Sequence, residues 1–125
     1  MSQPQAEEIL EMFAEGEGLE SVNTSLALHL VELARDLGRD ALVARLLDHA
    51  VKVSVNPEDQ GWCQFELLKH QGASLDEIIG LGMVSEQEGL AGLAAGIFHH
   101  VSLISLGTDD AEIFANRSMR LREVA

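Results

Sequence analysis

Residues 25–53 read SLALHLVELARDLG-RDALVARLLDHAVKV, two apolar helical runs divided by Gly38. Apolar residues of the first run recur every three or four positions, a period that predicts an amphipathic helix. They are Leu26, Leu30, Leu33 and Leu37, with Val31 and Ala34 beside them. A glycine at the junction fits the residue that follows a helix, because glycine adopts a positive φ without steric cost. The stretch therefore predicts two helices joined by a tight turn.

The same arrangement returns twice further along the chain. Gly72 follows Gly38 by 34 residues, Gly107 follows Gly72 by 35, and helical runs flank each glycine. A period near 34 is typical of stacked helical hairpins, because one hairpin cannot bury its apolar face alone. We therefore predict an all-α fold of about seven helices, arranged as stacked antiparallel helical hairpins in a short α-solenoid.

The 125 residues are predicted to form a single helical domain, 1–125. Its expected parts are an acidic helix and loop at 1–22, followed by hairpins at 23–56, 57–84 and 85–125.

Polar residues mark the expected helix starts. Asn56 before Pro57 predicts an N-cap, and Ser74 and Ser85 each open a capping-box pattern. The helix that begins at Ser85 is expected to continue to Leu106. In the last helix, the residues expected to face the core are Ile113, Phe114 and Met119.

The formal net charge is −13, and no lysine or arginine occurs between His70 and Asn116. This balance argues against direct binding to nucleic acid, because nucleic-acid-binding proteins usually present a basic face. It favours a protein partner with a basic or amphipathic segment, although acidity also serves solubility alone. Cys63 is the only cysteine, so an intrachain disulfide is excluded, and the N-terminus lacks an export-signal pattern. We expect a cytoplasmic protein.

Residues 89–108 contain no Asp, Glu, Lys or Arg, and 20 apolar residues could cross a bilayer. However, His99 and His100 lie in the middle of the stretch and four glycines dilute it. We therefore expect a buried helix and no membrane insertion. The apolar helix at 90–106 is also the expected surface of a homodimer.

Catalytic and metal-binding patterns are scarce. No two of the five histidines have the i,i+3 or i,i+4 spacing of paired helical ligands. Mixed pairs such as His29 with Glu32, or His70 with Glu66, offer only weak sites. Cys63 stands beside Trp62 in an apolar run, which favours an inert buried thiol. We expect no catalytic residues, no metal site and no cofactor, and therefore not an enzyme.

Trp62 and the sequence KHQGASLDEI at 69–78, together with the 34-residue period, resemble the tetratricopeptide repeat. A second segment, Leu28–His49 followed by NPEDQGW, is similar to an ankyrin repeat. Both families bind proteins through exposed helical or loop surfaces. The tetratricopeptide resemblance implies a groove lined by the first helix of each hairpin. Its groove positions fall on Glu32, Arg35, Asp36, Glu66, Lys69 and His70.

Two functions follow as expectations. The first is a non-catalytic protein-binding module, a cytosolic chaperone or adaptor; small acidic chaperones of type III secretion are similar in size, acidity and repeat type. The second is an acidic inhibitor that imitates nucleic-acid charge and blocks a basic site on an enzyme. Its acidic residues would be Glu7, Glu8, Glu11, Glu15, Glu17 and Glu20, or Asp109, Asp110 and Glu112.

Overall fold

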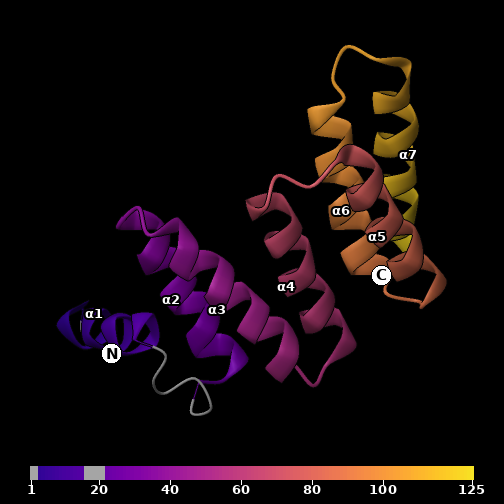
Figure 1. The fold of residues 1–125 in the computed structure, drawn as a ribbon. Coiled ribbons are helices and arrows are strands. Elements are labelled where there is room, and N and C mark those ends of the chain that lie inside the picture. The colour runs from indigo at the N-terminus through magenta and orange to yellow at the C-terminus, as the bar shows by residue number, and fades with distance from the viewer. Residues whose placement is uncertain (1–2, 16–21) are drawn as a thin grey trace. The chain divides into compact units, whose positions relative to one another are not determined.

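A computed structural model describes residues 3–15 and 22–125 of the chain. Seven α-helices and no strands occur in this part, which confirms the predicted all-α fold (Figure 1). Their bounds are α1 Gln3–Ala14, α2 Thr24–Asp36, α3 Asp40–Val53, α4 Pro57–His70, α5 Leu75–Gln87, α6 Ala91–Ile104 and α7 Asp109–Val124. Residues 16–21, most of the loop expected before the first hairpin, lie outside the described residues.

The chain divides into two compact units, residues 1–71 and 72–125. In the first unit α3 packs against both α2 and α4, and α1 contacts α2 and α3 (Figure 1). In the second unit α6 packs against both α5 and α7. The boundary between the units falls within the predicted hairpin 57–84, so α4 belongs to the first unit and α5 to the second. The single domain stays a prediction.

Glycines end four of the helices. Gly38, Gly72 and Gly107 have φ values of 71°, 69° and 91°, as the turn prediction requires. Gly89, with φ 79°, is a fourth such residue and joins α5 to α6. These backbone conformations are ones that other residues rarely adopt, so each glycine fixes the end of a helix.

Two of the three predicted caps form. The Asn56 side chain accepts hydrogen bonds from the backbone N–H groups of Glu58 and Asp59, and Ser74 accepts one from Glu77. The start predicted at Ser85 is wrong. Ser85 is buried inside α5, and its hydroxyl donates to the Leu81 carbonyl at 2.7 Å. Because this bond is made to the preceding turn, Ser85 continues the helix instead of capping a new one.

The core of the first unit is almost entirely aliphatic. Leu30, Leu46 and Leu47 are fully buried where α2, α3 and their neighbours meet, and Leu10 joins them from α1. Leu33 is buried as predicted, whereas Leu37 is 47% exposed because α2 ends at Asp36. The apolar stripe read from residues 25–37 therefore identifies the buried face of α2 up to its last turn.

The second unit is built around Phe98, which is fully buried on α6. Its ring stacks on Phe114 of α7, with centroids 5.8 Å apart and planes 12° apart. On the opposite helix, a Cβ added to Gly82 of α5 would lie 3.0 Å from two ring carbons of Phe98. Gly82 therefore lets α5 approach α6 closely.

Two side chains of α7 contradict the sequence prediction. Phe114 is partly buried, but Ile113 and Met119 are 58% and 63% exposed. The buried side of α7 instead carries Ser118, whose hydroxyl donates to the Ala95 carbonyl at 2.7 Å. Within the described residues, none of the helices is long and apolar enough to cross a membrane.

Candidate functional site

Four of the six predicted groove residues form one chain of ion pairs on the first unit. Arg35 of α2 contacts Glu32 at 3.2 Å on its own helix and Glu66 of α4 at 3.3 Å. Glu66 in turn contacts Lys69 at 2.8 Å. We call Glu32, Arg35, Glu66 and Lys69 the charged strip. Its charges alternate in sign, and it joins α2 to α4, the first helices of two predicted hairpins.

The helices that carry the strip are fixed at their N-termini by asparagine. Asn23 accepts a hydrogen bond from the Leu26 N–H at 2.8 Å and so begins α2, as Asn56 begins α4. Both helices pack on α3. Arg35 lies in the last turn of α2 and Lys69 in the last turn of α4, where a positive charge interacts favourably with the helix dipole.

The strip is accessible but not fully solvated. The side chains of Arg35, Glu66 and Lys69 are about one-third exposed, and that of Glu32 is 70% exposed. Burial alone would raise the pKa of Glu66. Hydrogen bonds and charge from Lys69, and then from Arg35, outweigh that effect and lower this pKa below its usual value. Glu66 is therefore held as a carboxylate between two cations.

The remaining two predicted residues do not join the strip. Asp36 is exposed and forms no ion pair with any described residue. His70 turns toward α3, where its Nε2–H donates to the Asp40 carbonyl at 3.0 Å. This bond satisfies a ring nitrogen and ties the end of α4 to the start of α3.

An aromatic side chain that was not predicted as part of the site lies beside the strip. The ammonium group of Lys69 lies 4.4 Å from the ring centroid of Phe65, which is one helical turn earlier. The ring centroids of Phe65 and Trp62 are 6.1 Å apart. Phe65 is buried, and Trp62 is partly exposed. The i,i+4 spacing of Phe65 and Lys69 could have predicted that the ammonium group lies over the ring.

Cys63 is 1% exposed and points into the core of the first unit. Burial raises the pKa of its thiol, a hydrogen bond with Ser54 acts in the opposite direction, and the nearby carboxylates of Asp59 and Glu66 raise it further. Because the thiolate is the reactive form, this environment suppresses nucleophilic chemistry.

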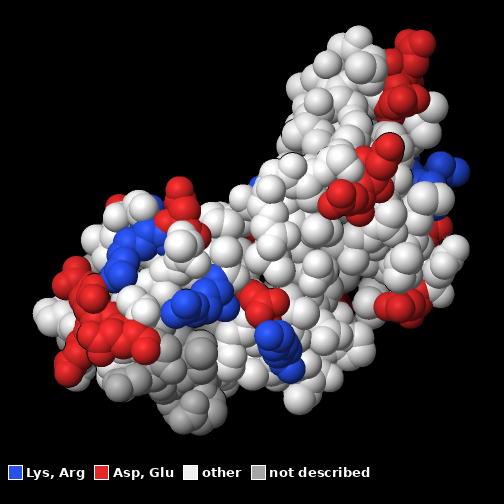
Figure 2. All heavy atoms as spheres, in the orientation of Figure 1, with Lys and Arg blue, Asp and Glu red and all other residues white. Residues whose placement is uncertain are grey.

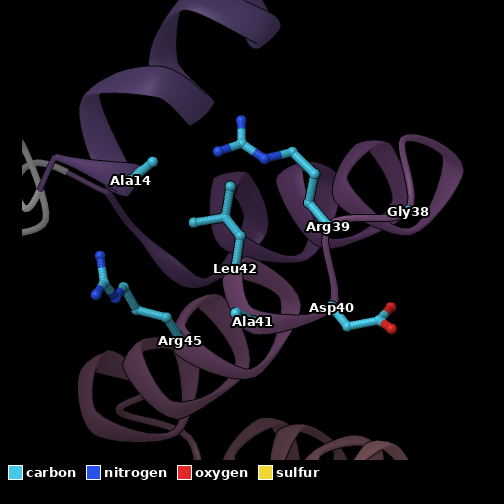
Figure 3. Close-up of a pocket in the computed structure, with 7 residues that line it drawn as sticks. All are labelled: Ala14, Gly38, Arg39, Asp40, Ala41, Leu42 and Arg45. Atoms are coloured by element: carbon cyan, nitrogen blue, oxygen red, sulfur yellow. The ribbon is translucent and has the colours of Figure 1, made fainter.

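A separate hollow of about 390 Å³ opens between the end of α1 and the start of α3. Figure 3 shows the side chains of Arg39 and Arg45 extending to the side of Ala14, with Leu42 between them, while Asp40 points away. Arg39 forms an ion pair with Glu11 of α1, so its guanidinium group already has a carboxylate partner.

Metal ligands do not gather in the part of the chain that the structure describes: no group of three His, Cys, Asp or Glu side chains there could hold an ion. The expectations of no metal, no cofactor and no enzymatic activity stay predictions.

Comparison of the chain with protein-family models, with curated proteins and with solved structures found no match.

Proposed function

We propose that this chain is a non-catalytic protein-binding module and that the charged strip of the first unit is its partner-binding surface. The contact between Arg35 and Glu66 carries the proposal. It unites side chains of α2 and α4 on one accessible surface, although the two residues are 31 positions apart in sequence. The resemblance to tetratricopeptide repeats implies a partner surface on these same two helices.

The alternating charges suit a partner segment that carries charges of its own. Each exposed ion pair contributes little to folding, roughly 0–1 kcal/mol, so exchanging it for an intermolecular pair is not costly. Trp62 is partly exposed and adds apolar surface beside the buried Phe65 ring that Lys69 covers, and a recognised segment commonly needs both kinds of contact. An amphipathic segment with at least one basic side chain fits this combination.

In its finer form, the proposal is a cytoplasmic chaperone or adaptor that holds such a segment. The overall acidity of the chain supports it, because a net charge of −13 attracts basic partners over a distance. Figure 2 shows acidic and basic groups interspersed on the visible face of the first unit.

Charge reversal tests the proposal directly. The full-length chain is tagged and used for affinity purification from its native host, with quantitative mass spectrometry of what co-purifies. The test variant combines Glu32→Lys in the strip with Asp36→Lys, one helical turn further along the same side of α2. Its control combines Asp48→Lys with Glu88→Lys, which makes the same change in net charge at exposed positions outside the strip. Circular dichroism checks that both remain helical.

We expect the wild type and the control to recover the same partner, and the test variant to recover at least about tenfold less of it. Equal recovery by the test variant and the control would reject the charged strip as the binding surface.

Exposed glutamates on α1 favour a second candidate function, the acidic inhibitor. Glu7, Glu8 and Glu11 are all exposed, as is Glu15 just after the helix, while Glu17 and Glu20 lie outside the described residues. Salt separates the two candidates. A charge mimic should release its partner steeply between about 50 and 200 mM salt, because its contacts are long-range and screened. Binding to a strip that combines ion pairs with the apolar surface of Trp62 should weaken less steeply over that range.

A further inference from the structure

The second unit has a groove along the outer side of its last two helices. It encloses about 510 Å³ and lies between the C-terminal half of α6 and the side of α7. The groove is lined by Leu103 of α6, by Leu106 of the turn that follows α6, and by Ala115 and Met119 of α7. Leu103, Leu106 and Met119 are 51%, 73% and 63% exposed. Single exposed apolar residues are ordinary, but here three of them line one groove.

One side of α7 carries a regular series along this groove. Glu112, Ala115, Met119 and Arg122 all line it, and their spacing of three, four and three residues keeps them on a single side of the helix. The series begins with an acidic residue and ends with a basic one. Between them stand a small residue and a large one.

The series is complementary to itself when reversed. If two copies of α7 pair antiparallel about a two-fold axis, Glu112 faces Arg122 of the other copy and Ala115 faces its Met119. Both pairs form in the same register, because position 117 is the midpoint between 112 and 122 and also the midpoint between 115 and 119. Two-fold symmetry then repeats each contact, so the interface contains two opposite-charge pairs and two small-to-large pairs. A parallel arrangement would instead place equal charges against each other.

We propose that the α6–α7 groove binds the same groove of a second copy of this chain, with the two α7 helices antiparallel. Leu103 and Leu106 flank the α7 series and would be covered on both copies. This surface differs from the apolar middle of the helix expected at 90–106. In the structure, Leu93, Ile97 and Val101 are fully buried within the second unit.

Charge reversal and charge exchange test the register. Analytical ultracentrifugation of the full chain over a concentration series measures the monomer–dimer equilibrium. We expect the wild type to dimerise and Arg122→Glu to weaken the dimer at least about tenfold, because each copy would then oppose Glu112 with a second carboxylate. Arg120→Glu is the matched control. It makes the same change two residues away, on a side of α7 that does not line the groove.

The double variant Glu112→Arg with Arg122→Glu exchanges the two charges and should restore dimerisation. This rescue separates a specific pair from a general loss of folding, which circular dichroism also monitors. A wild-type chain that remains monomeric at all concentrations would overturn the proposal and leave the groove to a helix of another protein. Equal weakening by Arg120→Glu and Arg122→Glu, or failure of the exchange to restore the dimer, would overturn it as well.

Discussion

The two units of this chain differ in their cores and in the side chains that they expose. The first unit buries an aliphatic core and joins some of its exposed charges into ion pairs across helices, as between Arg35 and Glu66. The described residues of the second unit have one such pair, Glu86 with Arg117. The second unit has an aromatic pair at its centre, Phe98 and Phe114, and leaves large apolar side chains on α7 exposed. On the face shown in Figure 2, uncharged surface dominates over the helices of the second unit, while charges of both signs are spread over the first.

This difference corresponds to the two kinds of recognition that we propose for this protein. The alternating charges of the charged strip suit a partner segment that also carries charged side chains. An apolar groove with opposite charges at its ends suits a helix of matching pattern, and α7 itself has that pattern. Because each surface lies within one unit, each can be altered without changing the core of the other.

Deleting a core side chain in each unit is the strongest test of their separateness. Phe98→Ala should lower the stability of the second unit by about 3–5 kcal/mol, and Leu47→Ala that of the first by about 2–5 kcal/mol. Hydrogen–deuterium exchange measures the stability of each unit separately. We expect faster exchange in α5–α7 for Phe98→Ala and in α1–α4 for Leu47→Ala.

Cys63 provides a second readout of the same pair of variants. It is buried in the first unit, so a thiol reagent should label it faster in Leu47→Ala and at the wild-type rate in Phe98→Ala. Equally fast labelling in both variants would mean that the two units unfold together.

Two glycines of α5 give a finer comparison within the second unit. Gly80 has open space where a Cβ would be added, so Gly80→Ala should raise the free energy of unfolding by up to about 1 kcal/mol. At Gly82 the added carbon would meet the buried Phe98 ring and Ile97 at 3.0–3.1 Å. We expect Gly82→Ala to be less stable than Gly80→Ala by about 1–3 kcal/mol in denaturant unfolding. Equal stabilisation by both would show that the α5–α6 contact is loose.

The charged strip predicts a small effect that depends on pH. The pKa of Glu66 is lowered in the folded chain, so its stabilising contribution is present at neutral pH and is lost as pH falls below the usual carboxyl value of 4.5. Glu66→Gln should therefore reduce stability by about 0.2–1 kcal/mol at pH 7, and the difference from wild type should shrink in acid. A difference that stays constant down to pH 3 would contradict the assigned ion pairs.

The sequence predicted the helices well because their signals are local. The leucine period of α2, the cap at Asn56 and the turn glycines depend only on neighbouring residues. The helix start predicted at Ser85 was wrong because a serine hydroxyl can either cap a helix or bond to the preceding turn within one. Gly89, four residues later, marks the actual junction between α5 and α6. A capping pattern is thus weaker evidence than a glycine where the two compete.

Features that depend on tertiary packing were harder to predict. The pairing of Arg35 with Glu66 requires the arrangement of α2 and α4 on α3, although the resemblance to tetratricopeptide repeats had already implied a role for both residues. The close contact at Gly82 and the exposure of Ile113 and Met119 depend on how α5, α6 and α7 pack. Periodicity on α7 is weak, and an apolar residue there can face either the core or a groove.

Hydrogen–deuterium exchange of the full chain, alone and with the partner recovered by affinity purification, tests whether the charged strip is the partner-binding surface. We expect slower exchange around the strip, in the C-terminal half of α2 and in α4, with α6 and α7 unchanged by the partner. Protection confined to α6 and α7, or to α1, would contradict this proposal.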